Sequence, residues 1–513
     1  MSDFSVLDIA IVVLYLGASV AIGLWANRFI TGLSGYLVAG RSLGTALSIA
    51  TMTGSELGLI TVMYQAQKGF TGGFAALHIG LIAGIVTLFV GLTGFIVVGL
   101  RRARVMTIPE YYEVRFDKQT RVTGGIFLAL GGILNMGLFL RVGSEFVVGV
   151  TGLEAGGATI AVVMTVLLAL VLLYTVLGGM VSVVLTDYLQ FVVLSIGLVA
   201  LVVLAIGQLG FDHIAEVVAE KRGAASFDPT AEGSGFGWDY ITWMGVLGLV
   251  SCAIWPTAVT RALSARDEGV VKRQYTFSSI SFMIRFLLPC FLGIAAFVFL
   301  TEAGATMLDD GSFILAGEET VHPSLRGMPV FLRETLPIGV LGLLTAAMLA
   351  AFMSTHDSYL LCWASVISRD IIAPLKPGKA TPQRQLLWTR IGIVVIGLYV
   401  LFWGIAYEPG QDVWDYLGIT GAIYFTGAIV VLAGGLYWKR ASRVGARWAL
   451  YAGLSAVLGL GPVKGFVAGL GPESFETWLL DRTSPQIGLA TLGTAVLAMI
   501  VGSLLFPDEK EVA

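Results

Sequence analysis

Small, polar and acidic residues interrupt an apolar run at Ala50-Thr51-Met52-Thr53-Gly54-Ser55-Glu56, and a proline interrupts another at Ser251-Cys252-Ala253-Ile254-Trp255-Pro256-Thr257. A backbone group without a hydrogen-bond partner is costly in hydrocarbon, so a break in a membrane helix needs a reason. Each break opens a group of five apolar runs, at 44–209 and 241–437. Either break alone would suit ordinary helix packing or a proline kink. Two breaks at matching positions of two halves instead predict an inverted-repeat transporter.

The composition excludes a soluble protein. The chain has 513 residues, of which 56% are hydrophobic and 13% are Asp, Glu, Lys or Arg, and it contains 65 glycines. An average soluble domain has about 25% charged residues, and these cover its surface. The net charge of −3 provides no basic field for nucleic acid. These values exclude a cytosolic enzyme, a nucleic-acid binder and a disordered scaffold, and they indicate an integral membrane protein.

Apolar runs long enough to cross a bilayer occur thirteen times. A transmembrane helix needs about 20 such residues, and the sequence lacks the alternation typical of an outer-membrane barrel. We predict an all-α integral membrane protein with an inverted five-plus-five repeat core, whose first and sixth core helices are broken. The predicted spans are 7–26, 44–66, 72–100, 121–150, 157–178, 180–209, 241–263, 274–302, 336–367, 383–406, 412–437, 445–470 and 485–506.

Basic residues concentrate in every second connection between these runs. Because Lys and Arg favour the cytoplasmic side, we expect a multi-pass protein of the plasma (inner) membrane, with its N-terminus outside and its C-terminus cytoplasmic. The N-terminal MSDFSVLD lacks the positive region of a secretory signal, so the first run is expected to remain as a helix. The basic connections include Arg28, Arg41, Arg101, Arg102, Arg104, Arg115, Lys118, Arg121, Arg261, Arg266, Lys272, Arg273, Arg369, Lys376, Lys379, Arg384, Arg390, Lys439, Arg440, Arg443 and Arg447, and the acidic ones include Asp212, Glu216, Glu220, Asp228, Glu232, Asp309, Asp310, Glu318 and Glu319.

The breaks and the connections also divide the chain into parts. We expect a leading helix and cytoplasmic loop, a first five-helix repeat, an extracellular loop, a second five-helix repeat, and two trailing helices with a short cytoplasmic tail. The predicted bounds are 1–43, 44–209, 210–240, 241–437 and 438–513.

The densest polar cluster inside an apolar run is Ser354-Thr355-His356-Asp357-Ser358. The i, i+3, i+4 spacing of Ser354, Asp357 and Ser358 places their oxygens on one helical face. Hard cations bind several oxygen ligands, so this face is a candidate cation site. Asp187 is a second acid at membrane depth, where a carboxylate needs a partner, a proton or a cation. Both acids could also hydrogen-bond neighbouring helices or carry the coupling proton.

Other polar residues in the apolar runs have simpler interpretations. Arg141 and Glu145 are spaced i, i+4 and could neutralise each other, although Arg141 could also bind a substrate carboxylate. His78 and Asn135 suit helix packing, and Arg285 is expected near an interface, which its long side chain can reach. The three cysteines are expected to be small buried residues: Cys252, Cys290 and Cys362.

Six local motifs recur in this order in one known family. The chain resembles the sodium/solute symporter family, which includes proline, sugar, sialic-acid, pantothenate and monocarboxylate carriers. The resemblance implies the inverted-repeat fold of the leucine transporter, with one helix before the ten-helix core and two after it. The motifs are Tyr36-Leu37-Val38-Ala39-Gly40-Arg41-Ser42-Leu43; Thr107-Ile108-Pro109-Glu110-Tyr111-Tyr112 with Arg115-Phe116; Gly178-Gly179-Met180; Thr186-Asp187-Tyr188-Leu189-Gln190; Ser354-Thr355 with Arg369-Asp370-Ile371; and Gly435-Leu436-Tyr437-Trp438-Lys439-Arg440.

The resemblance also implies two ion sites. A sodium ion would be bound between the first and eighth core helices, by carbonyl oxygens and two hydroxyls. A second sodium, found in some relatives, would involve the fifth and eighth core helices. Asp357 stands where these relatives have a serine, so the ion number and identity stay open. The first set is Ala50, Thr53, Ala351, Ser354 and Thr355, and the second is Asp187, Ser354, Asp357 and Ser358.

The solute-binding positions implied by the resemblance lie beside the breaks. Met52 replaces a polar residue of the proline and sugar carriers, and Leu57 replaces a glutamine of the sugar carriers. Both changes weaken a sugar or proline assignment. The full set is Met52, Gly54, Glu56, Leu57, His78, Asn135 and Trp255.

We therefore predict a sodium-coupled secondary active symporter that imports a small organic solute by alternating access. The expected partners are the solute, Na+ and the lipid bilayer, with no nucleic acid and no ATP. The sequence contains no H-E-x-x-H and no G-x-x-x-x-G-K-[ST] motif, which argues against an enzyme. A proton-coupled carrier of the same fold and a transporter-like sensor are the alternatives, and the oligomeric state is open.

Overall fold

A computed structural model of the chain describes residues 4–26, 41–154, 156–175, 180–407 and 412–508. Within these ranges the side chains of 19, 20, 22–26, 55, 174, 180–191 and 379 lie outside the description. The described chain is almost entirely helical. Its one sheet is a small antiparallel hairpin-like unit of three two-residue strands, β1 (Thr306–Met307), β2 (Phe313–Ile314) and β3 (Val321–His322).

The helices follow one another with short connections. The first half contains α1 (Val6–Ala26), α3 (Thr45–Glu56), α4 (Leu59–Gly72), α5 (His78–Thr93), α6 (Val97–Arg102), α7 (Ile108–Arg115), α8 (Lys118–Asn135), α9 (Phe139–Thr151), α10 (Gly157–Thr175), α11 (Met180–Leu209) and α12 (Phe211–Arg222). The second half contains α13 (Trp238–Ile254), α14 (Pro256–Ser264), α15 (Glu268–Glu302), α16 (Gly327–Thr335), α17 (Val340–Val366), α18 (Ala373–Leu375), α19 (Pro382–Ala406), α20 (Val413–Tyr437), α21 (Arg443–Gly453), α22 (Gly461–Ala468), α23 (Glu473–Leu480) and α24 (Ser484–Leu505).

Eight helices among the described residues are long and apolar enough to cross a membrane, or ten if two bent pairs are each one span. Two shorter apolar helices, Val6–Ala18 and Gly157–Leu173, accompany them. The sequence predicted thirteen spans, and each predicted run contains a helix. The count differs partly because Leu59–Thr93 is one helical stretch that contains both α4 and α5. Gly73, with φ of +62°, turns the chain between these two helices, a conformation that glycine adopts without strain.

The first break lies slightly later than predicted. Helix α3 continues through Gly54 to Glu56, and the chain leaves the helix at Leu57 and Gly58. The break therefore follows the predicted stretch 50–56 and does not lie within it. The Leu57 N–H donates to the Thr53 carbonyl at 2.7 Å, which closes the last turn of α3 and satisfies an otherwise unpaired carbonyl.

The second break lies at the predicted proline. Helices α13 and α14 meet at Trp255 with a bend of 40°, and Pro256 is the first residue of α14. Proline suits that position because the first helical N–H has no partner within the helix.

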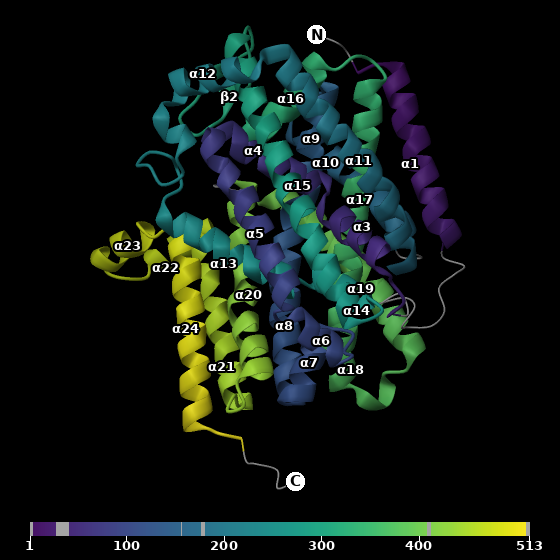
Figure 1. Cartoon of the computed structure of the whole chain (residues 1–513), viewed down its shortest axis with the longest axis vertical. Helices are drawn as coiled ribbons and strands as arrows, with labels where there is room; N and C mark the ends of the chain where they lie inside the picture. The colour runs from purple at the N-terminus through teal and green to yellow at the C-terminus, as the bar shows by residue number, and fades with distance from the viewer. Residues whose placement is uncertain (1–3, 27–40, 155, 176–179, 408–411, 509–513) are drawn as a thin grey trace.

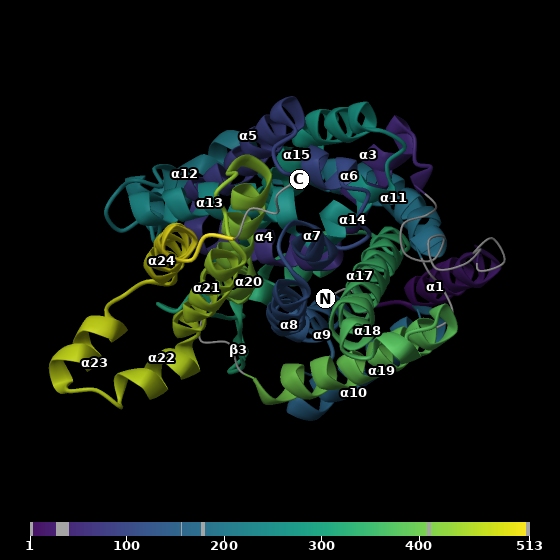
Figure 2. The ribbon, with the colours of Figure 1, turned by 90° about the horizontal axis from the view of Figure 1, so that it is seen from below.

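One predicted span is bent much more strongly. The run 445–470 forms Arg443–Gly459 and Gly461–Ala468, at 93° to each other. Pro462 stands in the first turn of α22, where it helps start a new helix but cannot continue the old one. Helices α22 and α23 consequently extend sideways from the bundle, as Figure 2 shows.

The ends of the bundle differ in content (Figure 1). Helices α12 and α16 and the small sheet gather at one end, and α6, α7 and α18 gather at the other. Helix α1 begins at the first end and α24 finishes at the second. Since α1 and α24 are the first and last long helices, this arrangement suits an odd number of crossings.

Close helix packing accounts for part of the high glycine content. Helices α4 and α15 cross at Gly69 and Gly293, where an added Cβ would overlap the carbonyl oxygens of Cys290 and Ala66. Small residues at such crossings let membrane helices approach backbone to backbone. This contact holds α4, the helix that follows the first break, against α15.

Several of the six sequence motifs contact one another at the end of the bundle that contains α7. Asp370 is buried and accepts hydrogen bonds from Thr107 Oγ1 and Arg121 Nε, both at 2.9 Å. Arg115 Nε donates to the Gly435 carbonyl at 3.0 Å. These contacts therefore tie α7 and α8 to the ends of α17 and α20.

Candidate functional site

A cavity of about 110 Å³ lies between the two helix breaks. Its walls are mostly apolar and aromatic, with a few polar groups, which is the usual character of a small-molecule site. The lining residues are Glu56, Ile60, Thr61, Tyr64, Ile79, Ala83, Thr87, Asn135, Phe139, Met244, Leu247, Gly248, Ser251, Cys252, Trp255, Phe282, Arg285, Phe286, Thr355, Tyr359, Trp414, Leu417, Gly418 and Phe425.

A buried ion pair joins α3 to α15 in this cavity. Arg285 Nη1 lies 3.2 Å from Glu56 Oε2, and Thr257 Oγ1 donates to Glu56 Oε1 at 2.9 Å. The guanidinium also lies over the ring of Phe282, 3.8 Å from its centroid. Only 8% of the Arg285 side chain is exposed, so the prediction that it reaches an interface is wrong. Its carboxylate partner and the aromatic rings hold it inside.

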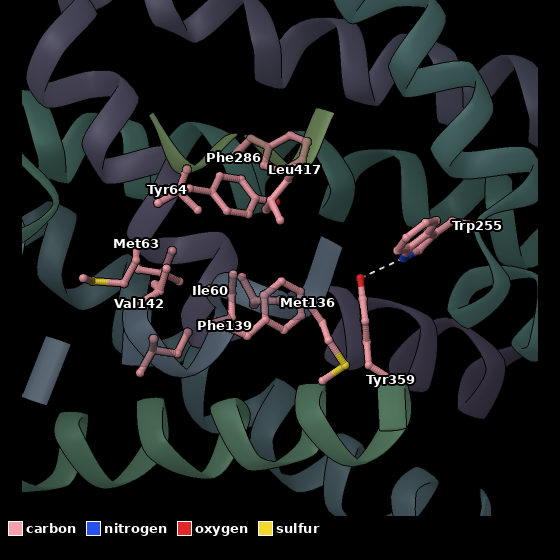
Figure 3. Close-up of a cluster of buried hydrophobic side chains, with 14 of the residues drawn as sticks. Ile60, Met63, Tyr64, Met136, Phe139, Val142, Trp255, Phe286, Tyr359 and Leu417 are labelled. Carbon is pink, nitrogen blue, oxygen red and sulfur yellow. Dashed lines mark hydrogen bonds between the residues drawn. The ribbon is translucent and has the colours of Figure 1, made fainter. Parts of the chain in front are cut away.

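One aromatic pair closes the cavity on one side. Trp255 Nε1 donates to Tyr359 Oη at 2.7 Å, and Figure 3 shows the two side chains reaching toward each other from α13/α14 and α17. A second cavity of about 40 Å³ is lined in part by Pro256 and Ser358, the chain neighbours of this pair, and by Arg261. The Trp255–Tyr359 pair therefore lines one cavity while its chain neighbours line another.

On the other side, aromatic and charged residues cover the cavity. Tyr64 stacks on Trp414 with 4.8 Å between ring centroids. Figure 3 places Tyr64 next to Phe286. One helical turn beyond Tyr64, Lys68 forms ion pairs with Asp412 and Asp415, each at 2.8 Å. Its side chain is 6% exposed, and this network ties α4 to the start of α20.

The first break rests directly on α17. A Cβ at Gly58 would overlap Thr355 Oγ1, and it would lie 3.5 Å from the Ala351 carbonyl oxygen. Thr355 Oγ1 in turn donates to that carbonyl at 3.0 Å. Ala50, Thr53 and Ser354 are buried in the same two helices. The break is thus next to carbonyl and hydroxyl oxygens of α17, and Thr355 also lines the cavity.

Residues 36–453 match the family model described as the sodium:solute symporter family. The chain belongs to this family. The symporter is 26% identical to a sodium/mannose cotransporter of Bos taurus over 485 residues, covering 88% of this chain and 78% of the relative. It is 23% identical to the osmoregulated proline transporter OpuE of Bacillus subtilis over 460 residues, covering 87% of each chain.

The fold has a close structural counterpart. The structure of a Na+-coupled sialic acid symporter in a substrate-bound outward-open state matches with a TM-score of 0.76 at 20% identity, covering 99% of this chain and 100% of that chain. The predicted fold class, an all-helical multi-span membrane protein with this transporter fold, is confirmed. The chain is a sodium-coupled solute symporter and not an enzyme, and Na+ is its coupling ion.

The residues implied for a second sodium are only partly described. Asp357 and Ser358 are buried in α17. Asp187 belongs to α11, but its side chain lies outside the described residues. Arg261, which the sequence analysis did not single out for this site, donates from Nη2 to Ser358 Oγ at 3.0 Å. A guanidinium thus uses one of the hydroxyls that the resemblance assigns to an ion.

The symporter brings three of the seven implied solute positions to the cavity, namely Glu56, Asn135 and Trp255. Asn135 Nδ2 donates hydrogen bonds to the Leu417 carbonyl at 2.8 Å and to Thr420 Oγ1. Met52, Gly54, Leu57 and His78 lie outside the lining described for this cavity.

Two of these outlying positions have other contacts. The His78 ring packs edge-on against Phe236, with 5.0 Å between centroids, while its neighbour Ile79 lines the cavity. Met52 is fully buried, and its sulfur accepts a hydrogen bond from Gln274 at 3.1 Å. Both contacts are those of packing residues.

The predicted pairing of Arg141 with Glu145 is present, at 2.9 Å, and Arg326 joins it at 2.6 Å from the same carboxylate. Arg141 does not line the cavity described above. The cavity arginine is Arg285 instead. Arg141 pairs with a carboxylate of its own helix, whereas Arg285 pairs with a carboxylate on another helix. Sequence spacing does not reveal a partner on another helix.

Proposed function

We propose that this symporter imports a small organic solute together with sodium by alternating access, with the solute in the cavity between the breaks. Sodium would be held by the carbonyls of Ala50, Thr53 and Ala351 and by the hydroxyls of Ser354 and Thr355. The observation that carries this proposal is the contact of Gly58 with Thr355 Oγ1 and the Ala351 carbonyl. Hard cations prefer oxygen ligands of this kind, and the end of α3 brings its own carbonyls to the same contact.

The shared position of Thr355 supports coupling between the ion and the solute. Thr355 contacts the break and also lines the cavity. Sodium at this position would order the break and complete one wall of the solute site, so each ligand would raise the affinity of the other. Each sodium that moves inward gains roughly 2.3 kcal/mol per 100 mV, which can drive solute uphill.

The charge distribution supports the proposed orientation in the plasma (inner) membrane. Basic residues such as Arg101 and Arg102 lie in α6, at the end with α7 and α18. The loops before α13 and around the sheet are acidic: hydrogen bonds from Thr230 lower the pKa of the Asp228 carboxyl, and hydrogen bonds from Ser312 lower that of Asp310. We propose that the acidic end faces outside and the basic end faces the cytoplasm. The division into two five-helix repeats remains a prediction.

Ser354→Ala combined with Thr355→Ala tests the sodium site. Loss of two oxygen ligands is expected to raise the sodium concentration for half-maximal effect by about 10- to 100-fold, since one lost hydrogen bond or ligand contact to a charged group costs about 1.5 kcal/mol or more. The measurement is the rise of melting temperature of the purified protein with NaCl, against choline chloride of equal ionic strength. Thr345→Ala is the control, because Thr345 is a buried hydroxyl of the same helix away from the break. Unchanged sodium dependence in the double variant would contradict the proposed site.

Asp187→Asn tests the second ion. If Asp187 helps to bind a second sodium, the variant is expected to transport one sodium fewer per solute, because a neutral amide binds a cation more weakly than a carboxylate. Paired isotope fluxes of sodium and solute in proteoliposomes measure this ratio. An unchanged ratio would assign Asp187 to helix packing.

A further inference from the structure

Arg285 is the one guanidinium in the lining of the cavity between the breaks. We infer that the transported solute is a small organic anion with a single carboxylate group and an apolar body, and that Arg285 binds the carboxylate. The inference rests on the proposed function, because it requires the solute to occupy this cavity.

The hydrogen bonding of Arg285 leaves room for such a ligand. Among the described residues, Arg285 donates one hydrogen bond, from Nη1 to Glu56 Oε2 at 3.2 Å. Charge-assisted bonds of this type are usually about 2.7–2.9 Å long. The Nε atom is buried and has no hydrogen-bond partner in the described structure. A planar guanidinium with unused donors fits a carboxylate in two-point contact.

The balance of charge favours one carboxylate. Glu56 and Arg285 neutralise each other in the cavity. Sodium at the proposed site would add one positive charge at Thr355, which lines the same cavity. A monocarboxylate restores neutrality, whereas a neutral sugar or a zwitterionic amino acid leaves one uncompensated charge in a region of low dielectric. This balance would also make carboxylate binding depend on sodium.

The cavity offers little to the hydroxyls of a sugar. Thr87 Oγ1 donates to the Ala83 carbonyl at 2.7 Å, and Thr61 Oγ1 donates to the Glu56 carbonyl at 2.8 Å. Asn135 Nδ2 likewise donates to Leu417 and Thr420 of α20. A buried hydroxyl without a partner is costly, and a sugar would bring several. The remaining lining suits a short alkyl chain: Ile60, Ile79, Ala83, Met244, Leu247 and Leu417.

The test is a melting-temperature titration of the purified full chain in sodium chloride and in choline chloride. The probes are propanoate and butanoate, the neutral isostere propanamide, the zwitterion alanine, and glucose. We expect both carboxylates to raise the melting temperature in sodium and to have little effect in choline, because ligands that bind the folded state stabilise it. Propanamide, alanine and glucose are expected to have no effect at the same concentrations.

Variants assign the effect to Arg285. Arg285→Gln is expected to raise the half-saturating propanoate concentration about 10- to 100-fold, since a charge-assisted contact is lost, while the stabilisation by sodium alone persists. Arg285→Lys keeps the charge and is expected to bind propanoate more weakly than the native protein but more tightly than Arg285→Gln. Glu56→Gln removes the competitor for the guanidinium and is expected to tighten propanoate binding several-fold. Arg326→Gln is the matched control, because Arg326 is a buried arginine paired with Glu145 outside this cavity.

Two results would overturn the inference and leave the symport proposal intact. One is sodium-dependent stabilisation by glucose, alanine or propanamide with none by the carboxylates. The other is an unchanged propanoate titration in Arg285→Gln. Failure of the symport proposal looks different: sodium alone would not stabilise the protein, or would do so equally after Ser354→Ala with Thr355→Ala.

Discussion

Gly58→Ala is expected to reduce sodium-coupled uptake at least about 100-fold. The added Cβ would overlap Thr355 Oγ1, so α4 would have to leave α17 or Thr355 would have to turn its hydroxyl away. Overpacking of a tight contact costs about 1–3 kcal/mol, and here it also displaces a proposed sodium ligand. Uptake of a carboxylate probe into proteoliposomes and sodium-dependent melting measure the two consequences.

Matched substitutions separate this effect from a general loss of helix packing. Gly245→Ala changes a helical glycine of α13 that has no atom within 4 Å of an added Cβ, so it is expected to leave folding and uptake unchanged. Gly58→Ala with Thr355→Ala removes the overlap and is expected to restore the melting temperature without restoring sodium binding. Native sodium dependence in Gly58→Ala would show that the break does not contact Thr355 during transport.

Lys68→Met is expected to destabilise the folded protein by about 3 kcal/mol. The substitution leaves Asp412 and Asp415 near each other without their shared cation, and removal of one partner from a buried ion pair typically costs about 3–5 kcal/mol. The low end of that range applies because each aspartate side chain is 25% exposed. Thermal and denaturant unfolding in detergent measure the loss.

Two further variants provide the control and the rescue for the Lys68→Met prediction. Lys221→Met removes an exposed lysine whose partner, Glu220, is also exposed, and a surface pair of this kind contributes little to stability. Lys68→Met with Asp415→Asn removes one of the two like charges and is expected to regain part of the stability. Equal losses for Lys68→Met and Lys221→Met would contradict the view that Lys68 holds α4 to α20.

The sequence predicted the membrane helices well because hydrophobicity over about 20 residues is a strong and local signal. The break at Pro256 was equally readable, since proline lacks the N–H that a helix interior requires. The first break was misplaced because Thr and Ser can bond within a helix turn and so leave it intact. The residue that decides the position, Gly58, lies between two leucines and looks like any packing glycine.

The solute site was harder to predict for a different reason. Glu56 is paired with Arg285, a residue on another helix and 229 positions away along the chain. No helical period relates two such residues, so periodicity could not distinguish Arg285 from an arginine at the membrane surface. Its role became visible only when the packing of α3 on α15 placed both residues in one cavity.

The position of one aromatic pair beside two cavities has a consequence for the cell. The hydrogen-bonded pair Trp255 and Tyr359 lines a cavity of about 110 Å³, and its chain neighbours Pro256 and Ser358 line one of about 40 Å³. A cell uses metabolic energy to keep its internal sodium concentration low. If the cavity were open to both sides of the membrane at once, sodium would leak inward without moving solute. Under the proposed alternating access, the Trp255–Tyr359 hydrogen bond would have to persist until the opposite side of the cavity has closed.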